Sequence, residues 1–553
     1  MNLTKKYHYQ DKNSLQSALE GKILNFNFWE WFYKNRLIII LLIALVFLAY
    51  FNSINNSFVS DDISAIPQNE NLNNFSYVSS NPQAFVRNLF YYSTNKVWGL
   101  NPAPYRLIGI LFHLGTVLTS YLLIWILLDP ITALISASLF AVHPILIEGV
   151  AWISGGLYAQ YSFFIILAIL FYVFSIKDKK FYLFSLAGMV MALLSSEKAV
   201  VFPFILLAFF VFFKDTFKDW KKLIIPFIVS SAWGLFYLFA IPKRIATLQA
   251  QNPQSIETLN PFLQIPIAIG SYLKLIFWPK DLTLYHSEMV FSQAQYLTCL
   301  LILILVLIII FISLKKKSQV FFWLSLFLIS LLPVLTPLGI SWIVAERYVY
   351  LGTLGIIATM AIFLKKLTEK ENLKTAVFVF CSLLTISLLA RTIIRNNDWQ
   401  NQDTLWIAAA KTSPSSSQNH NNLGDLYSRN GDYEKAIEEF KKAIELNPTY
   451  ADAFHNLANT YQQVGKTDLA VENYEKAIGI NSQLWQSYQN LAAIYFNQGD
   501  FQKAGQYQEK AVEINPENAS LHFNLGIIYA KNNEKEKADK EFQKAFDLDP
   551  KLK

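Results

Sequence analysis

Two adjacent aspartates, Asp61 and Asp62, follow closely an apolar run at residues 36–51 that is long enough to enter a membrane. Neighbouring carboxylates repel each other, so the pair is a candidate for chemistry. One acid can act as a general base, because its neighbour raises its pKa. The pair can also hold a divalent cation such as Mg²⁺ or Mn²⁺. The third possibility is structural, with Asp62 capping a helix that begins at Ile63. Taken alone, the pattern favours the cap.

Three further polar clusters interrupt apolar runs, in AVHPILIEGVAW (141–152), SSEKAV (195–200) and AERYVYLG (345–352). Ionisable residues at the edge of a membrane are costly to keep, so they are functional candidates. Arginine and lysine beside a membrane suit a lipid-linked phosphate. The structural alternatives are a helix break at Pro144 and an interfacial anchor built from Glu346–Arg347 and nearby tyrosines. The candidate residues for binding a donor or its phosphate are His143, Glu148, Glu197, Lys198, Arg244, Glu346 and Arg347.

The composition indicates a membrane protein with a polar C-terminal part. Hydrophobic residues make up 53% of the 553 residues and charged residues only 16%, whereas soluble domains average about 25% charged residues. Residues 417–553 carry a net charge of −5, and the preceding part carries +12. That basic charge is typical of loops held near anionic lipid and does not indicate nucleic-acid binding. The two cysteines, Cys299 and Cys381, lie inside apolar runs and offer neither a disulfide framework nor a metal-ligand spacing.

Clusters of basic residues predict the topology, since lysine and arginine are enriched in cytoplasmic loops. The clusters lie before residue 36 and at 177–180, 214–222, 315–317 and 365–374. About eleven spans place all of them inside, with the N-terminus cytoplasmic and the C-terminus outside. All the polar clusters then face the outer side. The predicted spans are 36–51, 104–127, 131–147, 157–176, 181–195, 199–213, 223–241, 296–314, 319–340, 349–364 and 374–394.

This topology does not assign one apolar stretch, residues 261–279, to a span. It contains Gln264, Lys274 and three prolines. We expect an interfacial or re-entrant helix on the outer side. The alternative is a twelfth span, which would move the C-terminus to the cytoplasm.

The C-terminal part repeats every 34 residues, with Gly431, Gly465, Gly499 and Asn533 in register. This is the tetratricopeptide pattern of helix–turn–helix units. The repeats fall at 417–450, 451–484, 485–518 and 519–552, after a partial leading repeat. Such repeats form a concave surface suited to extended peptides. Polar residues of the first helices are candidates for acceptor binding, although an ordinary solvated helix face explains any one of them equally well. They are Asn422, Asn456, Asn490 and Asn524, with Asn421 and Asn459 beside them.

The order of these motifs resembles the transmembrane and tetratricopeptide-repeat O-mannosyltransferase family, of the C superfamily (GT-C) of multi-spanning glycosyltransferases. The motifs are the aspartate pair, HPILIEGVAW, SSEK, YLKLIFWPKDLTLYHS (272–287), AERYVYLG, the segment 395–424 that joins the last span to the repeats, and the repeats. The resemblance implies an inverting transfer of a sugar from a polyprenyl-phosphate carrier to a hydroxyl, with Asp61 or Asp62 as the catalytic base, and it favours Asp61. It also implies that cationic residues receive the leaving phosphate and that the repeats present a protein acceptor.

We therefore predict an all-α protein, a polytopic helical bundle followed by an α-solenoid of repeats. The expected parts are a cytoplasmic segment 1–35, a membrane transferase domain 36–397, a connection 398–416 and four repeats at 417–552. The lysine-, asparagine- and isoleucine-rich composition favours a bacterial inner membrane, with the repeats extracytoplasmic. Two rival functions stay open. One is a non-catalytic membrane-anchored scaffold, and the other is the same fold glycosylating a lipid or a cell-wall glycan.

Overall fold

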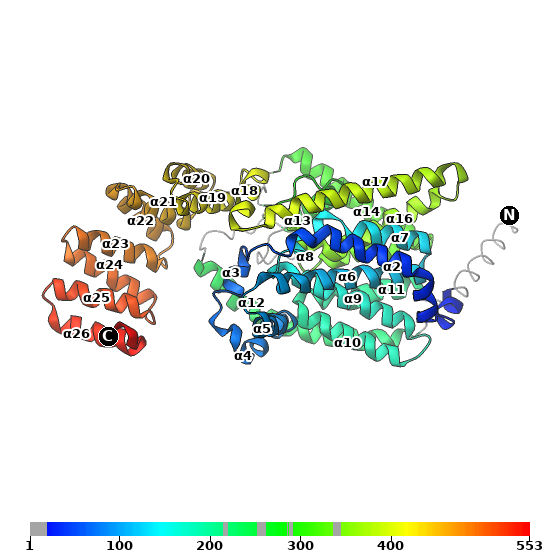
Figure 1. Ribbon diagram of the computed structural model, residues 1–553, viewed down its shortest axis with the longest axis horizontal. Helices are drawn as coiled ribbons and strands as arrows, with labels where there is room; N and C mark the ends of the chain where they lie inside the picture. Colours follow the sequence, from blue (N-terminus) through cyan, green and yellow to red (C-terminus); the bar gives the residue numbers. More distant parts are fainter. Residues whose placement is uncertain (1–18, 214–218, 252–260, 285, 287–290, 336–343) are drawn as a thin grey trace. The chain divides into compact units, whose positions relative to one another are not determined.

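The structure is a computed structural model that describes residues 19–213, 219–251, 261–284, 286, 291–335 and 344–553. For residues 240–251 and 261–262 it describes the backbone alone. Within these ranges every regular element is a helix (Figure 1), so the predicted all-α class is confirmed. Residues 1–18 of the predicted N-terminal segment and the end of the predicted span 319–340 lie outside the described residues.

The chain divides into two compact units. The first comprises Met1–Ala240 and Thr258–Ala408, and the second comprises Ile241–Glu257 and Ala409–Lys553. The division after Ala408 falls inside the segment 398–416 that the sequence predicts as a connection. Each unit is described below by itself.

The first unit is a bundle of apolar helices. Among the described residues, seven helical segments are long and apolar enough to cross a membrane, and the bent pair Pro130–Ala141 and Pro144–Val150 makes an eighth if it counts as one span. The bend is 56°, and Pro144 lies at it because proline cannot continue the preceding helix. The larger number of about eleven spans stays a prediction. The seven segments are Phe28–Ser53, Pro102–Leu127, Ser154–Phe174, Trp220–Phe239, Gln293–Lys315, Glu346–Leu367 and Glu371–Trp399.

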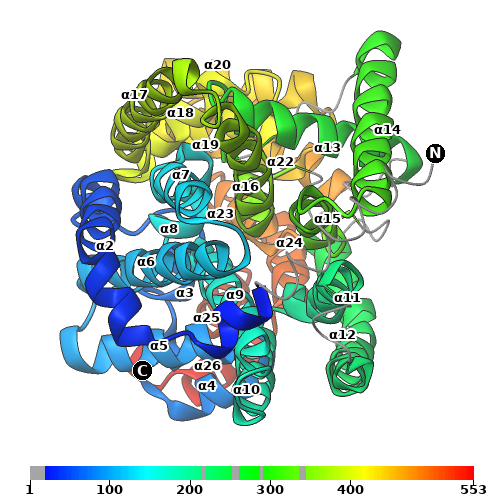
Figure 2. The same cartoon turned by 90° about the vertical axis from the view of Figure 1, so that its right-hand side faces the viewer.

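Burial separates the middle of this bundle from its periphery. Helices α9 (Leu157–Phe174) and α16 (Tyr350–Leu367) are packed on most sides and occupy the middle of Figure 2. Helix α14 (Gln293–Lys315) stands at the edge and exposes apolar side chains along its whole length. Other helices of this unit are α2 (Phe28–Tyr50), α6 (Pro102–Leu127), α7 (Pro130–Ala141), α8 (Ile147–Val150), α10 (Lys180–Ser195), α11 (Phe202–Phe213), α12 (Ile224–Gln251), α13 (Pro261–Phe277), α15 (Val320–Leu331) and α17 (Glu371–Asn396).

Helix α13 is formed by the apolar stretch 261–279, which the predicted topology does not assign to a span. It carries Pro266 inside the helix and packs so closely on α14 that a Cβ at Gly270 would lie 2.5 Å from Cys299 Sγ. Its side chains at Ile267, Ala268 and Tyr272 are buried in the protein. Helix α13 is thus a packed part of the bundle, and whether it spans a membrane stays a prediction.

The connection between α2 and α6 folds into short helices with a small core of its own. They are α3 (Asp61–Ala65), α4 (Phe75–Ser80) and α5 (Phe85–Trp98). Ile66, Leu72, Tyr91 and Tyr105 bury their side chains together against Ile153. This core ties the residues around the aspartate pair to the segment that follows α8.

The second unit contains the predicted repeats as four helix pairs, drawn from gold to red in Figure 1. Gly431, Gly465 and Gly499 have φ between 75° and 82°, and Asn533 takes the same place with φ 62°. Glycine and asparagine tolerate this left-handed conformation at a helix end, which explains the register. The pairs are α19 (Ser417–Arg429) with α20 (Tyr433–Leu446), α21 (Ala451–Gln463) with α22 (Thr467–Ile480), α23 (Trp485–Asn497) with α24 (Phe501–Ile514), and α25 (Ala519–Lys531) with α26 (Lys535–Leu548).

Candidate functional site

The two adjacent aspartates lie in different environments. Asp61 is exposed, whereas Asp62 is fully buried. The Asp62 carboxylate accepts hydrogen bonds from the Ser154 backbone N–H at 2.8 Å and the Ser154 hydroxyl at 2.6 Å, and a longer one from the Val59 N–H at 3.4 Å. Asp62 therefore joins its turn to the segment after α8, and Asp61 presents its carboxylate to the surroundings.

Burial raises the pKa of Asp62 to about 6, although the Ser154 hydrogen bonds and the positive charge of Arg106 oppose that rise. The expectation that Asp62 caps a helix is wrong. The N-cap of α3 is Ser60, which makes no side-chain capping bond, and Asp62 lies in the first turn. Its carboxylate is used for the tertiary contact with Ser154 instead.

Arg106 was not among the predicted site residues. Its guanidinium is buried and donates to the Ala151 carbonyl at 3.0 Å, to the Ser57 carbonyl at 2.5 Å and to the Asn56 carbonyl. It thereby fastens the chain before the aspartates to the end of the EGVAW motif. An arginine inside the predicted span 104–127 was the available signal, since a charge there needs partners.

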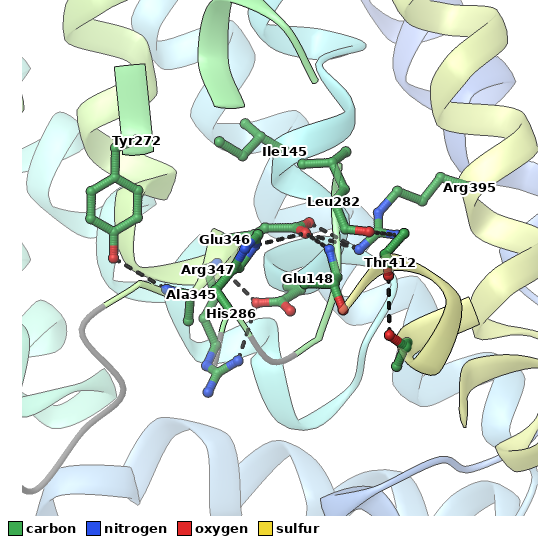
Figure 3. A network of polar contacts seen from close by, with 12 residues as sticks. Ile145, Glu148, Tyr272, Leu282, His286, Ala345, Glu346, Arg347, Arg395 and Thr412 are labelled. Atoms are coloured by element: carbon green, nitrogen blue, oxygen red, sulfur yellow. Dashed lines mark hydrogen bonds and ion pairs between the residues drawn. The ribbon is translucent and has the colours of Figure 1, made fainter. Parts of the chain in front are cut away.

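Glu148 and Arg347, two of the candidate binding residues, form an ion pair. The buried Glu148 Oε2 accepts from the Arg347 backbone N–H at 3.0 Å and from Arg347 Nη1 at 3.1 Å (Figure 3). Glu148 Oε1 has no hydrogen-bond partner among the described residues. His143 takes a different role, because its Nδ1 accepts from the Ile145 N–H at 3.3 Å and its Nε2 bonds the Ile276 carbonyl at 2.9 Å. The described contacts of His143 are thus those of a cap at the helix break.

Glu346 forms the second buried ion pair, with Arg395. Arg395 Nη2 donates to both carboxylate oxygens, at 3.0 and 3.1 Å, and Arg395 Nη1 donates to the Leu282 carbonyl at 2.9 Å (Figure 3). The Glu346 carboxylate also accepts from the Thr283 N–H, and His286 Nε2 lies 3.6 Å away. Arg395 was missed as a site residue because it stands at the end of an apolar run, where an arginine also reads as an interfacial anchor.

Two cationic side chains, Lys198 and Arg347, lie near the aromatic ring of Tyr348. Lys198 Nζ is 5.9 Å from the Tyr348 ring centroid and 5.3 Å from that of Tyr158, and it pairs with Glu197 at 2.9 Å. The Arg347 guanidinium is 5.1 Å from the Tyr348 centroid. We call Lys198, Arg347, Tyr158 and Tyr348 the cationic cluster. The side chains of Lys198 and Arg347 are mostly buried, with 15% and 12% of their surface exposed.

The segment RNNDWQNQ (395–402), which we call the linker segment, closes the other side of the aspartate turn. Asn396 donates to the Ala49 carbonyl and to Asn52 Oδ1, both at 2.8 Å. The Ser57 N–H donates to the Gln400 carbonyl at 2.8 Å, and the Ser60 N–H donates to Gln402 Oε1 at 3.0 Å. The motifs that the sequence places far apart are therefore connected by hydrogen bonds.

The structure brings together some of the predicted residues. Glu148, Glu346 and Arg347 lie in one network, and Lys198 with Glu197 joins it at Tyr348. Arg244 falls in α12, and its side chain lies outside the described residues. The assignment of catalytic and binding roles to these residues stays a prediction.

The described residues contain no group of three or more histidine, cysteine, aspartate or glutamate side chains that could hold a metal ion. Glu148 and Glu346 are each paired with an arginine. Whether the chain binds Mg²⁺ or Mn²⁺ stays a prediction.

The asparagines of the repeats divide into two kinds. Asn456 donates to Asn421 Oδ1 at 3.0 Å, and Asn490 donates to Asn459 Oδ1 at 2.8 Å and to the Tyr474 hydroxyl at 3.0 Å. These bonds run between successive repeats. Asn422 and Asn524 are half-buried, and the described hydrogen bonds include none of their side chains. Acceptor binding by any of these asparagines stays a prediction.

Comparison with known proteins identifies the repeats and extends beyond them. Residues 424–465 match a model described as TPR repeat, and residues 451–484 and 485–551 match models described as tetratricopeptide repeat. Among solved structures, a crystal structure of MamA is 26% identical and covers 27% of this chain and 86% of its own, with a TM-score of 0.25.

Two curated relatives match the chain over most of its length. Protein O-mannosyl-transferase TMTC3 of Mus musculus is 24% identical over 491 residues, which is 75% of this chain and 51% of the relative. The Homo sapiens protein of the same name is 23% identical over 475 residues, 72% of this chain and 50% of the relative. The chain spans about half the length of these relatives. The resemblance predicted from the order of the motifs is confirmed.

Proposed function

We propose that this chain is an integral-membrane glycosyltransferase that moves a mannose-like sugar from a polyprenyl-phosphate carrier to a hydroxyl of a protein acceptor. The similarity to O-mannosyltransferases and the apolar helices support the class of enzyme and its place in a membrane. The observation that carries the proposal is the cationic cluster, in which Lys198 and Arg347 lie on Tyr348.

The cationic cluster suits the leaving phosphate of the donor. When the bond between the sugar and the phosphate breaks, negative charge develops on the phosphate oxygen, and fixed cations stabilise that charge. Glu148 orients Arg347, and Glu197 orients Lys198. Because guanidinium has five N–H donors, Arg347 can hold Glu148 and still donate to a phosphate.

The exposed Asp61 suits the base at the other end of the reaction. The acceptor oxygen attacks the anomeric carbon while the bond from that carbon to the phosphate oxygen breaks, and the bonding electron pair leaves with the phosphate. Asp61 takes the proton of the acceptor hydroxyl. Attack from the face opposite the leaving group inverts the anomeric centre. Asp62, held by Ser154, fixes the turn that carries Asp61.

The repeats would bind the protein acceptor, and the donor would enter from the membrane. We place the N-terminus in the cytoplasm and the repeats and Asp61 on the extracytoplasmic side of an inner membrane, as the distribution of basic residues favours. A requirement for Mg²⁺ or Mn²⁺ is tested by adding EDTA to the assay below.

The test is transfer by the purified full chain in liposomes that contain radiolabelled undecaprenyl-phosphate mannose, with secreted proteins as acceptors. We expect label in protein, its loss in Asp61→Asn, and its retention in Glu70→Gln, a matched change at an exposed acid of the same connection. Unchanged transfer in both Asp61→Asn and Asp62→Asn would contradict the assigned base. Absence of transfer by the unaltered chain would favour the scaffold, and label in lipid or cell-wall glycan alone would favour the other acceptors.

A further inference from the structure

Ser60, the residue immediately before Asp61, has an unusual backbone conformation, with φ 52° and ψ −129°. Among the described residues two other non-glycine residues have positive φ, Lys317 and Asn533. Both follow the end of a helix, where a left-handed residue is common. Ser60 instead precedes a helix and carries a side chain that disfavours this region. Such a conformation persists only where its surroundings impose it, and it occurs preferentially at functional sites.

The Ser60 carbonyl accepts from the Ile63 N–H at 3.1 Å within its own turn, and the linker segment bonds this stretch of chain from outside. The Ser60 N–H donates to the side-chain oxygen of Gln402 at 3.0 Å, and the Ser57 N–H donates to the Gln400 carbonyl at 2.8 Å. On the opposite side, Ser154 holds Asp62 and Arg106 holds the carbonyl of Ser57. Because Asp62 and Ser57 are both fixed, the orientation of Asp61 depends on the conformation of Ser60. Among the described hydrogen bonds, that from the Ser60 N–H to Gln402 is the one that joins Ser60 to a side chain.

We propose that Gln402 is a positioning residue: its amide oxygen holds Ser60 at positive φ and thereby orients the Asp61 carboxylate. The consequence for transfer rests on the proposed function, in which Asp61 is the base. If the bond is lost, Ser60 relaxes towards negative φ and rotates the start of the turn, while Asp62 stays on Ser154. A shift of the base by about 1 Å is enough to slow a reaction by two orders of magnitude.

Three variants of the full chain test this inference. Gln402→Ala removes the acceptor, and Gln400→Ala is a matched control because the Gln400 side chain is exposed and its contact uses the backbone carbonyl. Ser60→Gly combined with Gln402→Ala is a rescue, since glycine adopts positive φ without a steric penalty. In the liposome assay we expect Gln402→Ala to lower kcat at least about tenfold with little change in the KM for the donor. We expect Gln400→Ala to match the unaltered chain and the double variant to recover most of the rate.

Hydrogen exchange of the peptide that contains residues 58–66 provides a measurement that does not need transfer. We expect faster exchange in Gln402→Ala than in Gln400→Ala. General damage to the fold by loss of Gln402 would not be repaired by glycine at position 60, so absence of rescue would overturn the positioning role. Normal kcat and normal exchange in Gln402→Ala would also overturn it. If Asp61→Asn is then inactive, the proposed function survives that failure. If the unaltered chain shows no transfer, the proposed function fails, and the exchange result still decides the inference.

Discussion

Arg395 and Glu346 meet face to face in the interior, with Arg395 Nη2 at 3.0 and 3.1 Å from the two carboxylate oxygens and 3% and 0% of the two side chains exposed. The pair joins the end of α17 to the start of the AERYVYLG motif. Arg395 neutralises the buried charge of Glu346, and Arg395 also pairs with Asp398 at 3.3 Å.

Removal of one partner should therefore be costly. We expect Arg395→Met to lower the free energy of unfolding by about 3–5 kcal/mol, because it leaves Glu346 as an uncompensated buried charge. Thermal unfolding in detergent measures this effect. Lys34→Met breaks the exposed pair with Glu30 and should cost less than about 1 kcal/mol. Equal effects of the two changes would contradict the account of the buried pair.

Two consecutive glycines should respond in opposite ways to alanine. A Cβ at Gly155 would lie 1.8 Å from the Glu148 carbonyl oxygen, whereas a Cβ at Gly156 meets nothing within 4 Å. We expect Gly155→Ala to destabilise the chain by about 2–4 kcal/mol, since the backbone beside Glu148 and Ser154 must shift. Gly156 has φ −57°, so Gly156→Ala should be neutral or stabilising by up to about 1 kcal/mol. The difference in unfolding temperature between the two variants checks this prediction.

The stability of the fold should fall as the pH rises through the pKa of Asp62. Burial raises the pKa of Asp62 from 3.8 to about 6, so between these values the folded chain holds a proton that the unfolded chain has released. Its contribution to the free energy of unfolding is fully present below pH 3.8 and is lost by about 1.4 kcal/mol per pH unit up to pH 6. Asp62→Asn should abolish this dependence in unfolding measured from pH 4 to 7.5. Asp61→Asn, the same change at the exposed neighbour, should preserve it, and a loss in both would point to another group.

The hydrogen bonds between repeats predict a difference between two equivalent asparagines. Asn490→Ala removes bonds to Asn459 and Tyr474 and should destabilise the repeats by about 1–2 kcal/mol. Asn524→Ala, one repeat later, should change stability by less than about 0.5 kcal/mol. Hydrogen exchange in α23 and α25 of the full chain measures both effects. If Asn524 binds the acceptor, its replacement should raise the KM for the protein acceptor without this change in exchange.

The repeats could be predicted closely from the sequence because their signals are local. Gly431 and its equivalents are required by a positive φ, and Ala436 and Ala443 are required by the close contact of paired helices. Each of these residue types recurs every 34 residues, so the assignment of one repeat supports the assignment of the others. The long membrane helices follow from apolar runs for the same reason.

The candidate site could be predicted only in part. Glu148, Glu346 and Arg347 were found because an ionisable residue beside an apolar run is conspicuous. Arg106 is also an ionisable residue in an apolar run. Its partners are backbone carbonyl groups of distant segments, and because every residue has a carbonyl group, the sequence does not identify them. The cap assigned to Asp62 failed because a tertiary partner, Ser154, competed for the carboxylate.

The conformation of Ser60 shows a further limit. A serine at positive φ has no sequence signature, since the residue type that favours the conformation would be glycine. The conformation comes from Gln402, some 340 residues away along the chain. Only the folded arrangement brings the two positions together.

The hydrogen bonds between the linker segment and the chain around residues 49–60 also depend on the order in which the chain is synthesised. The aspartate turn leaves the ribosome early, and Asn396, Gln400 and Gln402 leave it after the whole membrane part. A nascent chain therefore carries its acidic turn without these partners until the final membrane helix is in place. A chain that stops at residue 370 should insert its earlier helices but show rapid hydrogen exchange at residues 49–62. In the proposed enzyme, the acidic turn is therefore held by its full set of partners only once synthesis of the membrane part is complete.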